Sequence, residues 1–287
     1  QLELINWHKG NKDTRTVLEG TADAVDRFPY LCRSNANGAK GKYYWQQSHD
    51  LDGKGEEYTP IAEYYDPSGG NNGNLYGWFG GTYDGADYVI KNVSIKGGTA
   101  SCAGLFGVVY GGTLKNMILH DESGQGRIES GHDENTQTRW YAIGALAGVA
   151  AKDGGQGGVE SCAVSGYTIT ANVFTKGGAD AWGGSCIGGL LGISRMDLNG
   201  CSAVTNIVVP STAVDNDNMR IGGLVGVCQN IPEGEIDINT YAAITNCYAG
   251  GSIRVHKDAS KASFAAGQKP AASGNFSKGI YIGGIVG

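Results

Sequence analysis

The chain contains little proline and few charged residues, and it contains no long apolar run. Only 6 of its 287 residues are proline and 17% are charged, so its composition is not that of a chain kept disordered by charge. No apolar stretch approaches the roughly 20 residues that a membrane-spanning helix needs. With 40% hydrophobic residues, the chain is expected to fold around a buried core and to contain no transmembrane segment.

Runs of basic residues and closely spaced cysteine pairs are also missing. The net charge is −6, and residues 256–279 spread their lysines over small residues. An acidic chain without a basic patch is a poor candidate for binding nucleic acid. The seven cysteines are an odd number and form no C-x-x-C pair, which argues against structural zinc and a complete set of disulfides. We therefore expect no cofactor and no metal.

Glycine, by contrast, is abundant and carries an internal repeat. The chain has 49 glycines without a G-X-Y period, which excludes collagen. One phrase recurs as "CAGLFG", "AIGALAG", "CIGGLLG", "RIGGLVG" and "YIGGIVG". When the copies are aligned on their last glycine, the first apolar position is filled by Cys102, Ile143, Ile187, Ile221 and Ile282.

A second phrase follows the first after a variable gap. Its copies read "GTLKNMIL", "GGVESCAV", "LNGCSAV" and "AAITNCYA", and an earlier copy reads "YVIKNVSI". Short, partly β-branched segments bounded by Gly, Asn and Ser predict strands and turns. Repeated strands that cannot bury their faces alone must stack on one another, which predicts a β-solenoid. One apolar slot would then form a stacked, buried column of Val93, Met117, Cys162, Cys201 and Cys247.

The two ends of the chain differ from the repeats. Residues 1–75 are predicted to form a capping segment with lead-in strands and one helix, based on the spacing of Ala22, Val25 and Phe28. Residues 76–287 are predicted to form the solenoid. The final phrase, Ile282–Gly287, reads as the first strand of another coil whose second phrase is missing. We therefore expect the 287 residues to be a fragment or a processed form.

These phrases resemble the GLUG repeats of bacterial surface proteins. The copies "IGGLVG", "IGGLLG" and "AGLFG" match the repeat, and "WFGGTYDGADYVIKNVSI" resembles its introductory coil. The stretch "HDLDGKGEEYTPIA" resembles the family's lead-in, with His49 and Ala62 as departures. The resemblance covers most of residues 40–287. It implies an all-β, right-handed parallel β-helix-like solenoid at the bacterial cell surface or outside the cell, and it brings no catalytic residue to this chain.

Three groups of polar or thiol residues are candidates for a chemical site. The strings "HDES" at 120–123 and "HDEN" at 132–135 contain metal-ligand types without the HExxH spacing. The acids Asp50, Asp52, Glu56 and Glu57 are close enough for a Ca²⁺ loop, but Gly53 is misplaced for an EF-hand. Turn-forming Asp-Gly is the commoner use. Cysteines that share a slot with valine and methionine are expected to be inert core residues.

The aromatic residues give the strongest indication of function. Trp140 and Tyr141 precede one glycine phrase, and Trp182 precedes the next at a similar offset. Stacked repeats would bring these rings together as a strip for a glycan or a protein. We therefore expect a non-catalytic adhesion or binding module, for which GLUG-containing adhesins are the parallel. The alternatives are a polysaccharide-acting enzyme, an accessory domain of a larger secreted hydrolase or peptidase (GLUG repeats also occur in IgA-protease-like metallopeptidases), and a passive stalk.

Overall fold

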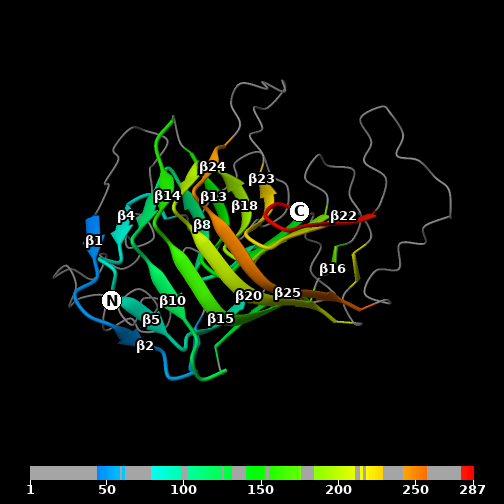
Figure 1. The fold of residues 1–287 in the computed structure, drawn as a ribbon, viewed down its shortest axis with the longest axis horizontal. Helices are drawn as coiled ribbons and strands as arrows, with labels where there is room; N and C mark the ends of the chain where they lie inside the picture. Colours follow the sequence, from blue (N-terminus) through cyan, green and yellow to red (C-terminus); the bar gives the residue numbers. More distant parts are fainter. Residues whose placement is uncertain are drawn as a thin grey trace, which may run out of the picture.

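A computed structural model describes thirteen stretches of the chain, and every element in them is a β-strand (Figure 1). The expected helix around Ala22–Phe28 lies outside these stretches. The described residues are 44–58, 60–61, 79–97, 102–124, 126–130, 140–152, 155–172, 174–175, 184–210, 214–215, 218–228, 242–256 and 279–287.

Four parallel sheets contain most of the described residues, and each is named here after one of its strands. The β14 sheet contains, in spatial order, β1 (Tyr44–Gln46), β4 (Thr82–Asp84), β9 (Thr113–Lys115), β14 (Gly158–Glu160), β19 (Leu198–Asn199) and β24 (Ile244–Thr245). The β15 sheet contains β2 (Leu51–Asp52), β3 (Glu57–Tyr58), β5 (Val89–Lys91), β6 (Ser94–Gly97), β10 (Ile118–His120), β11 (Arg127–Ser130), β15 (Ala163–Thr170), β20 (Ser202–Val209) and β25 (Tyr248–Val255).

The other two sheets are formed by the glycine phrases. The β17 sheet contains β7 (Cys102–Ala103), β12 (Trp140–Gly144), β17 (Gly184–Gly188), β22 (Asn218–Gly222) and β26 (Gly279–Gly283). The β18 sheet contains β8 (Phe106–Tyr110), β13 (Ala147–Ala151), β18 (Leu191–Arg195) and β23 (Val225–Cys228). A short separate ladder joins β16 (Phe174–Thr175) to β21 (Val214–Asp215).

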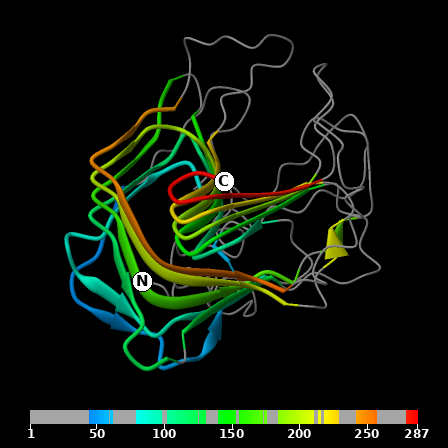
Figure 2. The same cartoon turned by 45° about the vertical axis from the view of Figure 1, so that its right-hand side comes forward.

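The chain passes through the sheets in a fixed order: β14 sheet, β15 sheet, β17 sheet, β18 sheet. One such passage is called a layer, and each new layer pairs in parallel with the one before it. The first layer contains β1–β3 and the sixth contains β24–β26. Figure 2 shows the layers nested as successive arcs. The expected all-strand, parallel architecture is therefore present in the described residues.

The glycine phrase is a strand, a bend and a second strand, in keeping with the strands and turns that its composition predicts. In "RIGGLVG", β22 ends at Gly222, Gly223 and Leu224 form the bend, and β23 begins at Val225. In one regular strand, neighbouring apolar residues would face opposite sides of the sheet. The bend interrupts this alternation. Leu224 and Val225 are both fully buried in the same core.

Two predicted alignments are wrong by the observed register. Cys102 pairs with Ala142, and it is Ala103 that pairs with Ile143. Two residues separate Ala103 from Phe106, whereas three separate their partners Ile143 and Ala147. Val93 does not join the cysteine column, because Val89 pairs with Ile118. The turn between β4 and β5 has four residues, whereas the turn between β9 and β10 has two. The dipeptide Lys-Asn therefore occurs at two different places in the layer: it follows β5 in one copy and β9 in the next.

The remaining cysteine column is confirmed, and it lines the core. In successive layers Ile118 pairs with Ala163, Ala163 with Ser202, and Ser202 with Tyr248. The residues directly before these four form the column: Met117, Cys162, Cys201 and Cys247. The first three are buried, and Cys247 packs against the core from the last layer. At the other end of the stack, Phe106 contacts the rings of Phe79 at 5.0 Å and Tyr83 at 6.0 Å between ring centres.

A second, smaller apolar cluster lies between the β17 and β18 sheets. It contains Cys102, Ala142, Cys186 and Ile193, with Val108, Val149 and Val227 packed against it. The other faces of these two sheets contribute Ile187 and Leu191 to the main core. The bent phrase therefore has apolar packing on both sides, which explains why it carries so few polar residues.

Candidate functional site

Two of the three residues of the predicted aromatic strip belong to the β17 sheet. Trp140 and Tyr141 are the first residues of β12, where they pair with Gly184 and Ser185 of β17. Trp182 lies outside the described residues. The backbone therefore places two of the three predicted residues where the chain joins the β17 sheet.

The longest recurrent connections begin and end on the same side of the stack as these two residues. The β15 sheet is joined to the β17 sheet through residues 131–139, 171–183, 210–217 and 256–278 in four successive layers. In Figure 1 the end of β25 and the start of β26 both lie at the right-hand side. Two of these connections also pair in parallel, with Phe174 opposite Val214. We call this region the connection side.

A second polar region lies at the opposite corner, between the β14 and β15 sheets. Asp84 is buried and accepts hydrogen bonds from Tyr44 Oη at 2.6 Å and from Asn116 Nδ2 at 3.0 Å. Its own turn adds the amide of Ala86 at 2.9 Å, and Lys115 Nζ forms an ion pair with it at 3.3 Å. Asp84 thus ties the first three layers together.

The electrostatics of Asp84 match this bracing role. Burial acts to raise the pKa of Asp84, but the hydrogen bonds from Tyr44, Asn116, Ala86 and Lys115 outweigh it and lower the pKa to about 2. The same carboxylate raises the pKa of Lys115 by hydrogen bonding to it. Asp84, Lys115 and Glu160 follow one another in the sheet register with alternating charge.

This corner gives a testable pH dependence. Because the pKa of Asp84 is depressed in the folded state, its contribution is complete above the ordinary value of 3.8 and is lost as the pH falls through about 2. We expect Asp84→Asn to lower the free energy of unfolding by about 2 kcal/mol at pH 7. The variant should also lose less of its remaining stability than the wild type when the pH falls from 4 to 2. Urea denaturation over this range measures both effects. Asp87→Asn, at an exposed acid of the same turn, should leave the loss of stability at low pH unchanged. An equal effect of both substitutions would contradict the bracing role of Asp84.

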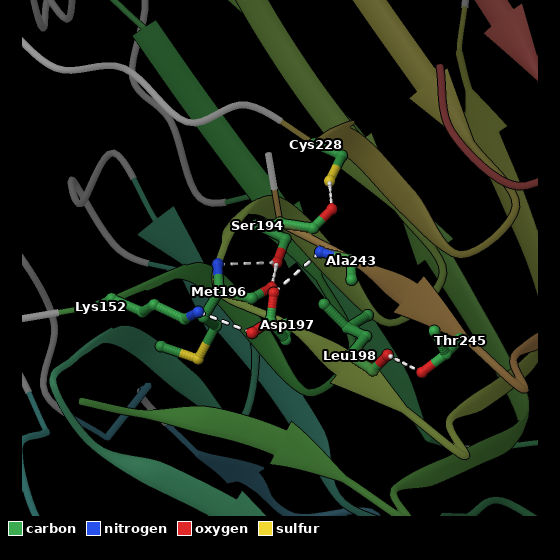
Figure 3. Close-up of polar contacts among 9 residues, drawn as sticks. Lys152, Ser194, Met196, Asp197, Leu198, Cys228, Ala243 and Thr245 are labelled. Atoms are coloured by element: carbon green, nitrogen blue, oxygen red, sulfur yellow. Dashed lines mark hydrogen bonds and ion pairs between the residues drawn. The ribbon is translucent and has the colours of Figure 1, made fainter. Parts of the chain in front are cut away.

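A similar brace joins three layers at the corner between the β18 and β14 sheets. Figure 3 shows Asp197 between Lys152 and Ala243. Lys152 Nζ donates to Asp197 Oδ2 at 2.6 Å, and the Ala243 amide donates to Oδ1 at 2.8 Å. The hydrogen bond from Lys152, followed by that from Ala243, lowers the pKa of Asp197. The neighbouring Ser194 hydroxyl is buried and donates to the Met196 carbonyl at 2.9 Å, so it is not poised as a nucleophile.

The histidine-containing string at residues 120–123 is divided between the two faces of the β15 sheet. His120 Nδ1 and Ser165 Oγ lie 2.8 Å apart, whereas Asp121 is buried and accepts hydrogen bonds from the amide and hydroxyl of Ser123. A Ser–His pair is part of a nucleophilic set, but such a set needs a third group that orients the imidazole. In the described stretches, no carboxylate is hydrogen-bonded to His120. The string at 132–135 lies outside them.

Two of the acids of the candidate calcium loop accept hydrogen bonds from protein groups. Asp52 Oδ1 accepts hydrogen bonds from the Lys54 amide at 2.9 Å and from Asn92 Nδ2 at 3.2 Å. Asp50 Oδ1 accepts one from the Val89 amide at 2.9 Å. Within the described residues, no group of three His, Cys, Asp or Glu side chains is placed to hold a metal ion.

The stacked cysteines behave as core residues. Cys162 Sγ donates to the Glu160 carbonyl at 3.3 Å, and Cys201 Sγ donates to the Val159 carbonyl at 3.3 Å. Burial raises the pKa of the Cys162 thiol well above its usual value, which disfavours the reactive thiolate. The six cysteines in the described part of the chain are free thiols, and Cys32 lies outside it.

Comparison of the chain with protein-family models, with curated proteins and with solved structures gave no match. The GLUG resemblance therefore stays a prediction from the repeated phrases. Among the described residues, no helix has the length and apolarity required to cross a membrane.

Proposed function

We propose that this chain is a right-handed parallel β-helix-like solenoid of the GLUG type, displayed on a bacterial surface, that acts as a non-catalytic adhesion or binding module. The parallel layers, each adding one passage through the same four sheets, are what such a solenoid requires. The repeated bent phrase and the two apolar clusters that it separates support the same assignment. The partner is a glycan, a protein or another component of a host or neighbouring cell surface.

The observation that carries this proposal is the connection side. Variable insertions of a repeat protein that map to one face often form its binding face, because they vary without disturbing the stacked core. Here the four long connections from the β15 sheet to the β17 sheet start at the ends of parallel strands and finish at the beginnings of parallel strands. Trp140 and Tyr141 begin β12 on the connection side, and Trp182 belongs to the connection before β17. Amphipathic rings in such a place suit sugar rings and apolar protein surfaces.

The proposal predicts that the tryptophans carry the binding. We expect Trp140→Ala/Trp182→Ala to weaken binding by at least about tenfold, because buried aromatic anchors often contribute more than 1.4 kcal/mol each. The wild type and the double variant are compared on an array of glycans and host extracellular proteins, and the positive spots are then titrated.

The matched control is Tyr88→Ala. Tyr88 is 39% exposed and lies at the corner between the β14 and β15 sheets, away from the connection side, so its removal should leave every positive spot unchanged. Circular dichroism verifies that all variants are folded. A binding profile that survives in the double variant, or one lost equally in Tyr88→Ala, would rule out the connection side as the contact surface.

A further inference from the structure

The outer face of the β14 sheet carries a row of polar side chains in three successive inner layers. Lys115 of β9 pairs with Glu160 of β14, and Glu160 pairs with Asn199 of β19. The residues directly before them are 0% exposed and belong to the main core: Leu114, Val159 and Leu198. Because alternate residues of a strand point to opposite faces, the three polar side chains lie on the outer face. In Figure 1 strands β1, β4 and β14 lie toward the left, away from the connection side.

This row alternates between hydrogen-bond donors and acceptors. The Lys115 ammonium donates, and its side chain is 32% exposed. Glu160 is exposed, and no hydrogen bond or ion pair in the described stretches engages its carboxylate. Asn199 Oδ1 accepts from Thr245 Oγ1 and from Asn246 Nδ2, both at 3.1 Å, which leaves the Asn199 amide to donate. Three layers therefore present a donor, an acceptor and a donor in turn.

Gly158 leaves room on the outer face next to Glu160. It pairs with Thr113 in one neighbouring layer, and it lies beside Asp197 in the other, because the residues that follow these two are paired. A Cβ added at Gly158 would have only the Glu160 side chain within 4 Å, with Oε1 at 3.4 Å. Beyond Gly158, Lys152 Nζ and Asp197 Oδ2 form an ion pair at 2.6 Å (Figure 3). The cover over Gly158 is therefore a single flexible carboxylate.

We propose that this face binds a neutral, hydroxyl-rich glycan that lies along the stack across β9, β14 and β19. It is a second contact surface, separate from the connection side, and it does not depend on the aromatic strip. A sugar hydroxyl both donates and accepts hydrogen bonds, so it can bond to Lys115, Glu160 and Asn199 alike. The bonds to the two charged groups are the stronger ones. An ammonium has three donors, so Lys115 can bind a hydroxyl and keep its ion pair with Asp84.

The alternating charge favours a neutral chain over a charged one. A polyanion along the row would place negative charge beside Glu160, and a polycation would place positive charge beside Lys115, where like charges repel. The ion pair of Lys152 with Asp197 presents both signs, so it favours neither. A neutral glycan meets no such repulsion, and the room beside Gly158 admits the edge of a sugar where a larger residue would exclude it.

Isothermal titration calorimetry of the full chain tests this surface. The neutral probes are cellohexaose, xylohexaose and mannohexaose, and the charged probes are hexagalacturonate and a chitosan hexamer. At least one neutral probe should bind, and both charged probes should bind at least about tenfold more weakly. Glu160→Gln should weaken the neutral complex at least about tenfold, because it removes a charged acceptor. Glu122→Gln, at an exposed acid of the turn after β10, should leave the complex unchanged.

Gly158→Thr tests the room beside Glu160 without removing a polar group. Threonine already occupies this register in β4 and β9, at Thr82 and Thr113. Because threonine also suits a strand better than glycine, the variant should melt no lower than the wild type. It should still weaken the neutral complex at least about tenfold, because the added side chain fills the room and displaces the Glu160 carboxylate.

The tryptophan variant separates this surface from the connection side. Trp140→Ala/Trp182→Ala should retain the neutral complex. The proposal fails if no neutral probe binds, if a charged probe binds as tightly, or if the complex survives in both Glu160→Gln and Gly158→Thr. It also fails if the complex is lost only in the tryptophan variant, and in that case the connection side alone binds the glycan.

Discussion

Replacing Gly166 with alanine is expected to lower the free energy of unfolding by about 3 kcal/mol or more. Gly166 has φ +81°, and holding a residue with a Cβ in this left-handed region costs about 1–2 kcal/mol. The new Cβ would also overlap the backbone carbonyl oxygen of Asp121 in the preceding layer. Because Gly166 lies within β15 and Asp121 directly follows β10, neither backbone can move without disturbing the ladder, which adds about 1–3 kcal/mol.

Gly155 provides a matched control for the conformational part of this effect. Its φ is +82°, and a Cβ added there would have no atom within 4 Å. We expect Gly155→Ala to cost only the left-handed backbone term of about 1–2 kcal/mol. Urea denaturation of the wild type and both variants measures the difference. Equal losses would show that the close approach of the third and fourth layers at Gly166 does not restrict the side chain.

Gly166 also shows what the sequence could not reveal about the fold. It sits where the pairing of β15 with β20 shifts register between Ser165 and Thr168, a bulge in a strand that the repeated phrases do not mark. The phrases did predict stacking strands and the column of Met117, Cys162 and Cys201, because equivalent slots must lie above one another. They failed at Val93 and Cys102, because one turn is longer and one glycine phrase is a residue shorter between its two strands.

The two bracing carboxylates were missed for a related reason. Asp84 is held by Tyr44 and Asn116, which are 40 and 32 residues away in the chain. Asp197 is held by Lys152 and Ala243 at 45 and 46 residues. Such partners can be recognised as neighbours only when the number of residues in one layer is known, and that number varies from layer to layer. The signal available in the sequence was an acid at the turn beside each repeated phrase, which alone does not distinguish a brace from a solvated loop.

Substituting one isoleucine of the stacked column should have very different effects in different layers. Ile187 is 0% exposed and lies between Ile143 and Ile221 in the register of the β17 sheet. We expect Ile187→Ala to lower the free energy of unfolding by about 3–4 kcal/mol, the usual range for a cavity that its neighbours cannot fill. Chemical denaturation at a concentration at which the chain is monomeric measures this loss.

Ile282 occupies the same column in the last layer, and there the expected loss is small. Its side chain is 57% exposed, so its truncation removes little buried area and should cost less than about 1 kcal/mol in the monomer. An equal loss for both substitutions would mean that the sixth layer is as well packed as the fourth.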